Sequence, residues 1–278
     1  MRILLTNDDG YDAPGLAAMR RALLSPAFRE GYADGDEVEV VVVAPSRVQS
    51  ATGHAITLHR QVEVSRRLEP YEGYAVGGRP ADCVKLALTR LNVEPIHLVV
   101  SGMNAGANVG FNVFYSGTVG AAREATIQGF PAVATSLYLR DRDHDHWDRA
   151  AQHAADAIVR LGRAGVERAG LTTINVPVLD GGFEPKGLAV CPMSTAPLAE
   201  RWEAEGKGEV GVLYSAGPGM RFRDEPPGTD VERLFDGWVT ATPLGIDPTS
   251  FGEVRAMKAE LENCGAGVPQ ASSPGDGG

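Results

Sequence analysis

The sequence predicts an α/β protein built on a Rossmann-like, doubly wound and mostly parallel sheet. Apolar runs typical of buried strands occupy residues 1–6, 37–44, 97–101, 132–136 and 172–176. Segments whose apolar residues have helical spacing occupy residues 14–24, 80–91, 118–128 and 146–162. Strands that alternate with helices in this way are joined by crossover helices, which place the strands parallel in a doubly wound fold.

The first three elements show the local reasons for this prediction. Residues 37–44 contain five valines and stop at Pro45, as expected of a buried strand. Pro14 suits the first turn of a helix, and Leu16 and Met19 begin an apolar stripe at helical spacing. A strand, a helix and a second strand at this distance form a βαβ unit with a right-handed crossover.

The second part of the chain follows a different pattern. Residues 181–230 are rich in Gly, Pro, Glu and Arg and contain only short strand-like pieces. We therefore expect an α/β core over residues 1–180 that carries the functional site. Over residues 181–263 we expect a protruding β-hairpin arm, a returning strand and a C-terminal helix that serve oligomerisation. Residues 264–278 are of low complexity, which predicts a disordered tail.

Charge and composition narrow the classes of partner. The formal net charge of -10 argues against binding a nucleic-acid polymer, which normally requires a basic face. The acids at positions 8 and 9 come too early for a secretory signal, and no apolar run is long enough to span a bilayer. The three cysteines have no spacing typical of disulfides or zinc sites. We therefore expect a cytoplasmic protein without a membrane partner.

Two adjacent carboxylates follow the first predicted strand. Asp8 and Asp9 lie between Asn7 and Gly10, at the sheet edge where doubly wound folds bind ligands. Two carboxylates so close together repel each other, and a hard divalent cation such as Mg²⁺ or Mn²⁺ removes that repulsion. An Asp-Gly turn with solvated acids also explains the tetrapeptide, so these four residues leave both interpretations open.

Polar segments also follow the other predicted strands. Ser50 comes after the second strand, where its hydroxyl can reach the same ion, and His54 nearby is a core, capping or catalytic residue. Asn104 and Asn108 lie in a glycine-rich loop, and each offers an amide oxygen to a metal and an NH₂ group to a phosphate. Ser116 is either an ordinary N-cap of the following helix or part of an anion site at its first N–H groups.

The linked order of these motifs resembles the survival protein SurE family of nucleotidases. The resemblance covers the chain from Met1 to about Asp247, and it rests on TNDDGYDAPGL, VVAPSRVQSATGHAITL, GGRPADCVKLAL, VVSGMNAGANVGFNVFYSGTVGAAREA and PPGTDVERLFDGWVTATPL. Members of this family have a Rossmann-like core with a protruding hairpin and an exchanged C-terminal segment. The resemblance therefore implies a homodimer or a homotetramer.

The resemblance also implies roles for individual residues. One divalent metal ion per subunit, Mg²⁺ or Mn²⁺, would be held by Asp8, Asp9, Ser50 and Asn104. The phosphate would be lined by Asn108, Ser116, Gly117 and Thr118. Asp8 and Asp9 are the candidate catalytic residues, and the candidates for a supporting role beside them are Asn7 and His54.

The activity implied is hydrolysis of nucleoside 5′-monophosphates to nucleoside and phosphate. The family also acts on 3′-monophosphates, and some members trim short polyphosphate. Adjacent acids favour attack by water over an aspartyl-phosphate intermediate, for which a D-x-D motif is typical. Two alternatives stay open, namely a nucleotide sensor without turnover and a metal-dependent sugar-nucleotide transferase.

Overall fold

The computed structural model describes residues 1–91, 93, 95–139, 146–199, 202–208, 211–216, 221–222 and 226–263. The predicted disordered tail, residues 264–278, lies outside the described residues. The contacts between residues divide the chain into two units, Met1–Leu244 and Gly245–Gly278. The central sheet and all the predicted site residues belong to the first unit. No helix among the described residues is long and apolar enough to cross a membrane.

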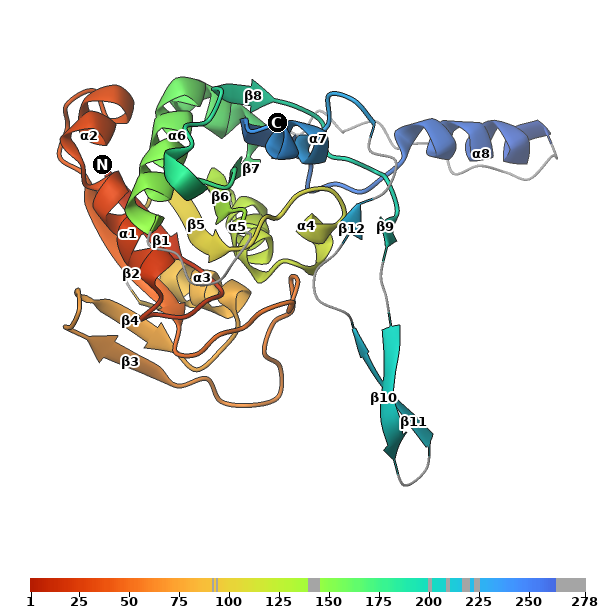
Figure 1. The fold of residues 1–278 in the computed structure, drawn as a ribbon, viewed down its shortest axis with the longest axis horizontal. Coiled ribbons are helices and arrows are strands. Elements are labelled where there is room, and N and C mark those ends of the chain that lie inside the picture. Colours follow the sequence, from red (N-terminus) through yellow and green to blue (C-terminus); the bar gives the residue numbers. More distant parts are fainter. Residues whose placement is uncertain are drawn as a thin grey trace, which may run out of the picture. The chain divides into compact units, whose positions relative to one another are not determined.

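A nine-stranded sheet forms the centre of the first unit, in the order β3-β4-β2-β1-β5-β6-β7-β13-β8 (Figure 1). Its strands are β1 (Arg2–Thr6), β2 (Glu39–Pro45), β3 (Val64–Arg67), β4 (Gly73–Val76), β5 (Leu98–Ala105), β6 (Ala132–Leu137), β7 (Leu171–Val176), β8 (Leu188–Val190) and β13 (Val239–Leu244). The run from β4 to β7 is parallel, while β3 and β13 pair antiparallel to β4 and β7. The predicted mostly parallel α/β fold is confirmed.

The order of the strands reverses next to β1. The chain passes from β1 to β2 on one side, and later returns to the other side of β1 as β5. In doubly wound sheets, ligands bind beyond the carboxyl ends of the strands at such a reversal. Asp8 and Asp9 follow β1, and Asn104 lies near the end of β5. The topology therefore places these three residues at the reversal.

Helices cover both faces of the sheet. They are α1 (Pro14–Leu23), α2 (Pro26–Tyr32), α3 (Pro80–Thr89), α4 (Asn112–Tyr115), α5 (Gly117–Ile127), α6 (Trp147–Ala169) and α7 (Asp230–Phe235). One buried cluster joins the sheet to α1, α2 and α6, and a second joins it to α3 and α5. Along β1, Ile3 and Leu5 belong to the first cluster and Leu4 to the second, which is the alternation expected of a strand buried on both faces.

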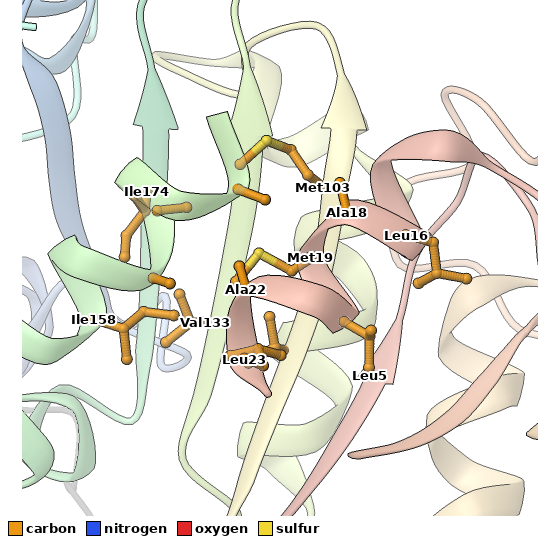
Figure 2. Close-up of a cluster of buried hydrophobic side chains, with 14 of the residues drawn as sticks. Leu5, Leu16, Ala18, Met19, Ala22, Leu23, Met103, Val133, Ile158 and Ile174 are labelled. Carbon is orange, nitrogen blue, oxygen red and sulfur yellow. The ribbon is translucent and has the colours of Figure 1, made fainter. Parts of the chain in front are cut away.

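Helix α1 illustrates this packing. Met19 and Leu23 are fully buried on its inner side, where Figure 2 shows them among Leu5, Val133 and Ile158. Burying a side chain of this size contributes about 1.5–3 kcal/mol to folding. The packing of α1 also restricts how the preceding turn, which carries the two acids, can leave β1.

The second part of the chain contains β9 (Leu198–Ala199), β10 (Trp202–Gly208), β11 (Gly211–Ala216), β12 (Arg221–Phe222), the short 3₁₀ turn η1 (Asp180–Gly182) and α8 (Phe251–Asn263). Strands β10 and β11 form an antiparallel hairpin, and β9 pairs with β12. Strands β8 and β13, which we assigned to the second part, extend the core sheet beside β7. The compact unit runs to Leu244 rather than to residue 180, because these strands satisfy their backbone hydrogen bonds in the core sheet.

Asp230 joins the start of α7 to the loop after β5. Its side chain is fully buried, and its Oδ2 accepts a hydrogen bond from the Gly110 N–H at 2.9 Å. Its Oδ1 accepts from the N–H groups of Ser194, at 2.7 Å, and Val231, at 2.9 Å. One buried carboxylate therefore satisfies backbone donors from three segments of the chain.

We expect Asp230→Ala to lower the free energy of unfolding by roughly 3 kcal/mol or more, because each buried donor left without an acceptor costs about 1–3 kcal/mol. Urea denaturation measures this loss. The matched control is Asp236→Ala, at the exposed end of the same helix, which should cost much less. Equal losses in the two variants would contradict this account of Asp230.

Candidate metal and phosphate site

A tight turn after β1 holds the two adjacent acids. Asn7 is fully buried, and its Nδ2 donates to the carbonyl oxygen of Gly10 at 2.9 Å while its Oδ1 accepts from the Gly10 N–H at 3.2 Å. Gly10 has a φ of 104°, a backbone conformation that glycine adopts without a steric penalty. Asn7 thus braces the turn in which Asp8 and Asp9 lie.

Asp8 and Asp9 are hydrogen-bonded to different elements. Asp8 is only 5% exposed, and its Oδ1 accepts from the Thr118 hydroxyl at 2.5 Å. Asp9 accepts through Oδ2 from the Ala105 N–H at 2.9 Å, at the end of β5. Burial raises the pKa of Asp8 to about 6; hydrogen bonds from Thr118 oppose this rise and the charge of Asp9 adds to it. A cation beside the pair would favour the charged form of both carboxylates.

A cavity of about 250 Å³ opens beside these acids. The predicted site residues that line it are Asp8, Ser50, Asn104, Asn108 and Ser116. Asp9 is hydrogen-bonded to another lining residue, Ala105. Residues from the turn after β1, the loop after β2, the end of β5 and the start of α5 thus line one open cavity.

The loop after β2 is held at this cavity by its backbone. The Gln49 N–H donates to the carbonyl oxygen of Asp8 at 2.7 Å, and the Gly53 N–H donates to that of Tyr115 at 2.8 Å. Ser50 lies between these two anchors, is exposed and lines the cavity. The position of Ser50 is therefore set by backbone hydrogen bonds on either side of it.

Asn104 and Asn108 present different groups to the cavity. The Nδ2 of Asn104 donates to the carbonyl oxygen of Gly106 at 2.6 Å, so its Oδ1 is the group suited to a cation. The Nδ2 of Asn108 donates to the Ser136 hydroxyl at 2.9 Å, and the Asn108 N–H donates to Oδ1 of Asn175 at 2.8 Å. Because an amide nitrogen carries two hydrogens, one of those on Asn108 is still available to an anion.

The start of α5 closes another side of the site. Ser116 is the N-cap, and its Oγ accepts from the Val119 N–H at 3.1 Å, which leaves its hydroxyl hydrogen for a ligand. Thr118, predicted beside the phosphate, donates its hydroxyl to Asp8 instead. Gly117 lies so close to Asp8 that an added Cβ would come within 2.9 Å of both the Cβ and the Oδ2 of Asp8.

His54 does not line this cavity. Its Nε2 lies 2.8 Å from Oε2 of Glu124 on α5, and the Lys85 Nζ lies 3.0 Å from the other carboxylate oxygen. Burial would raise the pKa of Glu124, but hydrogen bonds from Gln128, Lys85 and His54 together lower it. His54 therefore ties the loop that carries Ser50 to α5 and is not among the residues that line the cavity.

The oxygen-rich donor set is consistent with a hard divalent cation. Over the described parts of the chain, no cluster of three or more His, Cys, Asp or Glu side chains is placed to hold a metal. The two carboxylates would therefore need further ligands, and the Ser50 hydroxyl and Asn104 amide oxygen are the donors at hand. Mg²⁺ and Mn²⁺ prefer such oxygen ligands and commonly keep water molecules as well.

Asn112 and Tyr115 also line the cavity, although the sequence reasoning gave neither of them a role. Both belong to the four-residue helix α4, which lies between the Asn-rich loop and α5. A pattern of asparagines at positions 104, 108 and 112 was the available signal for Asn112. No comparable signal distinguishes Tyr115 from an ordinary surface aromatic residue.

Comparison with known families identifies the group to which this chain belongs. The sequence model of the family described as survival protein SurE matches residues 3–200. The chain belongs to the survival protein SurE family. The matched range includes every residue predicted for the metal and phosphate site.

Several relatives of this SurE chain match along nearly their whole length. A protein named 5′-nucleotidase SurE from Stenotrophomonas maltophilia is 36% identical over 270 residues, which cover 97% of this chain and 99% of that protein. A protein of the same name from Rhodopirellula baltica is 42% identical over 269 residues, covering 93% and 98%. The crystal structure of the SurE protein from Aquifex aeolicus superimposes with a TM-score of 0.75 at 30% identity, covering 94% of this chain and 99% of that one.

The close approach of Gly117 to Asp8 predicts that a larger residue at position 117 destabilises this SurE chain. A methyl group at Gly117 would overlap the buried Asp8 side chain, so we expect Gly117→Ala to lower the free energy of unfolding by about 1–3 kcal/mol. Gly165→Ala is the matched control, because a Cβ at that helical position meets open space and alanine favours helix. Chemical denaturation that showed no loss for Gly117→Ala would exclude the tight contact.

Proposed function

We propose that this chain is a divalent-metal-dependent phosphohydrolase that converts nucleoside 5′-monophosphates to nucleoside and phosphate. The observation that carries the proposal is the cavity at the strand reversal, where Asp8 faces the Ser- and Asn-bearing loops and the start of α5. Asp9, the next residue, is hydrogen-bonded to Ala105 in the lining of the same cavity. Family membership supports it, since full-length relatives bear the name 5′-nucleotidase. Cleavage of 3′-monophosphates and of short polyphosphate would use the same phosphate site.

The metal would be one Mg²⁺ or Mn²⁺ per subunit, held by Asp8, Asp9, Ser50 and Asn104. When bound, such an ion supplies positive charge at a phosphate oxygen and lowers the pKa of a coordinated water. Thr118 and Asn7 support these candidate metal ligands indirectly, because Thr118 holds Asp8 and Asn7 holds the turn in which Asp8 lies. The chain thus orients its candidate ligands before any ion arrives.

The phosphate would be bound by donors that the described residues of the protein do not use. These are the Ser116 hydroxyl hydrogen, the Gly117 N–H at the first turn of α5 and the second amide hydrogen of Asn108. Donors fixed in this way stabilise the charge that develops on the phosphoryl oxygens, because they need little reorganisation during the reaction. One carboxylate of the Asp8–Asp9 pair would orient the attacking water and accept its proton. As the new P–O bond forms, the bond to the nucleoside oxygen breaks, and this oxygen takes up a proton to become the nucleoside hydroxyl.

A phosphate-release assay tests this function directly. We expect turnover of a nucleoside monophosphate to need added Mg²⁺ or Mn²⁺, to stop in excess chelator and to return when the metal is restored. Asp8→Asn and Asp9→Asn should each lower kcat/KM by about a hundredfold or more, since each removes one charge from the site. Asp148→Asn, at an exposed acid on α6, is the matched control.

Full activity in excess chelator, or in the double variant Asp8→Asn/Asp9→Asn, would contradict the proposed mechanism. Binding of a nucleoside monophosphate without any phosphate release would favour the sensor, and transfer of a sugar from a sugar nucleotide would favour the transferase. Calorimetry with the nucleotide and the metal separates binding from turnover in the same preparation.

We also propose that the second part of the chain builds a homodimer or a homotetramer. On α8, Val254, Met257 and Leu261 form one apolar stripe, and all three side chains are exposed. An amphipathic helix with an exposed apolar stripe is typical of an interface, and a closed symmetric oligomer would bury the stripe of every subunit. The β10–β11 hairpin is a further candidate for such contacts.

Light scattering at micromolar concentration should therefore report at least a dimer for the full chain. Met257→Glu/Leu261→Glu should lower the measured mass, because it places charges in the apolar stripe. The control Ala256→Glu/Ala259→Glu adds the same charge to the other side of α8 and should keep the wild-type mass. A monomeric wild type, or an equal response of the two double variants, would refute this assembly.

We place the protein in the cytoplasm. Cys83 and Cys191 are both free and buried, and burial raises the pKa of each thiol. Free thiols are typical of reducing compartments, which supports this location.

A further inference from the structure

A row of polar residues crosses three neighbouring strands near the cavity. Strands β5, β6 and β7 lie side by side (Figure 1), and their register pairs Asn104 with Ser136 and Ser136 with Asn175. Residues paired across a sheet carry their side chains on the same face. Asn104 lines the cavity, whereas Ser136 and Asn175 are not among the lining residues and are each only 1% exposed. The proposed chemistry leaves these two buried polar residues without a role.

Asn175 binds the backbone of Asn108. Its Oδ1 accepts from the Asn108 N–H at 2.8 Å, and its Nδ2 donates to the Asn108 carbonyl oxygen at 3.1 Å. Both backbone groups are thus bound as in a hydrogen-bonded pair of antiparallel strands, but by one side chain 67 positions away. A buried amide is unfavourable unless it is hydrogen-bonded, and these two bonds offset the burial of Asn175. Asn175 therefore fixes where the loop after β5 carries residue 108.

Ser136 holds the side chain of the same residue. Its Oγ accepts from the Asn108 Nδ2 at 2.9 Å, and the second hydrogen of that nitrogen is the one assigned to the phosphate. The terminal torsion of an asparagine is broad, so its amide needs a hydrogen bond to keep one direction. Ser136 is also the register partner of Asn104. One residue of β6 thus lies next to both a candidate metal ligand and a candidate phosphate donor.

We propose that Asn175 and Ser136 are positioning residues of the phosphate site and act through Asn108. Asn175 sets the place of Asn108, and Ser136 sets the direction of its amide. This inference rests on the proposed function and deepens it, because it assigns the strength of phosphate binding to two residues that contact neither the phosphate nor the metal. A donor that is fixed in advance needs little reorganisation, so releasing it weakens phosphate binding and leaves the metal ligands unchanged.

The neighbouring strand β13 provides a matched control. Thr240 is the register partner of Asn175 on that strand, and it is fully buried. Its hydroxyl has no hydrogen-bond partner among the described residues. Thr240→Val therefore removes a buried hydroxyl beside Asn175, with little change of shape, and takes no hydrogen bond from Asn108.

Calorimetric titration with inorganic phosphate at saturating Mg²⁺ tests the proposal without depending on turnover. We expect Ser136→Ala to raise the Kd for phosphate by about tenfold, the order expected when one hydrogen bond to a charged group is weakened. Asn175→Leu should raise it at least as much, because it also releases the loop, whereas Thr240→Val should keep the wild-type Kd. The Kd for Mg²⁺ measured without phosphate should stay unchanged in all three variants, because the Asn104 amide is held by its own hydrogen bond to Gly106.

Combination with Asn108→Ala shows whether the two residues act through Asn108. If they do, adding Ser136→Ala or Asn175→Leu to that variant should change the Kd for phosphate by less than about twofold. Additive losses, a wild-type Kd in Ser136→Ala or an equal loss in Thr240→Val would overturn the positioning role. A parallel loss of Mg²⁺ affinity would also overturn it, because the whole site would then have loosened. Melting temperatures report folding, and Ser136→Ala decides the question if Asn175→Leu does not fold.

These outcomes are distinguishable from failure of the proposed function. A wild type that binds phosphate but releases none from a nucleoside monophosphate would refute the phosphohydrolase, while the titrations would still decide the roles of Ser136 and Asn175. A wild type that hydrolyses the nucleotide, together with a wild-type Kd for phosphate in Ser136→Ala, would refute only the positioning role. A wild type that binds no phosphate would overturn the positioning role as well.

Discussion

The close approach of the start of α5 to the buried carboxylate of Asp8 is the contact on which the site depends. Removing a carboxylate from water is costly unless hydrogen bonds or opposite charge compensate for it. The Thr118 hydroxyl, at 2.5 Å from Oδ1, supplies one such hydrogen bond, and Gly117 allows the helix to come this near because it has no Cβ. The part of the desolvation cost that hydrogen bonds do not offset raises the pKa of Asp8. The neighbouring charge of Asp9 raises this pKa further. Because the charged carboxylates are unfavourable in the empty site, a cation that binds beside them would stabilise the site strongly.

The surrounding fold stabilises this arrangement through long-range contacts. The loop that carries Ser50 is tied to Asp8 through the Gln49 N–H and to α5 through His54 and Glu124. Farther along the same loop, Thr57 donates to Asp82 on α3 through its N–H and its hydroxyl. These contacts join the loop to helices on the second face of the sheet. Candidate ligands on different segments are thus held by shared partners, which reduces the reorganisation that binding would require.

The parts of the fold that could be predicted are those with a strong local pattern. The valine-rich β2 and the amphipathic α1 were predicted close to their observed bounds, because burial on a sheet imposes a period that the residues display. The edge strand β3, its neighbour β4 and the short helices α4 and α7 were not predicted. Each has four to six residues and is too short for a period. Their structure depends on partners elsewhere, as in the pairing of β4 with β2 and the hydrogen bonds of Asp230.

The sequence by itself determined which residues could reach the site, because the ends of parallel strands share one edge of the sheet, where Asp8 and Ser50 follow two such strands and Asn104 lies near the end of a third. Only the tertiary structure decided how the polar groups are used. Thr118 is committed to Asp8 and His54 to Glu124, a residue 70 positions away, while the Oδ1 of Asn112 has no donor among the described residues. A hydrogen bond depends on distance and direction between atoms, and residues far apart in the sequence acquire these only when the chain has folded.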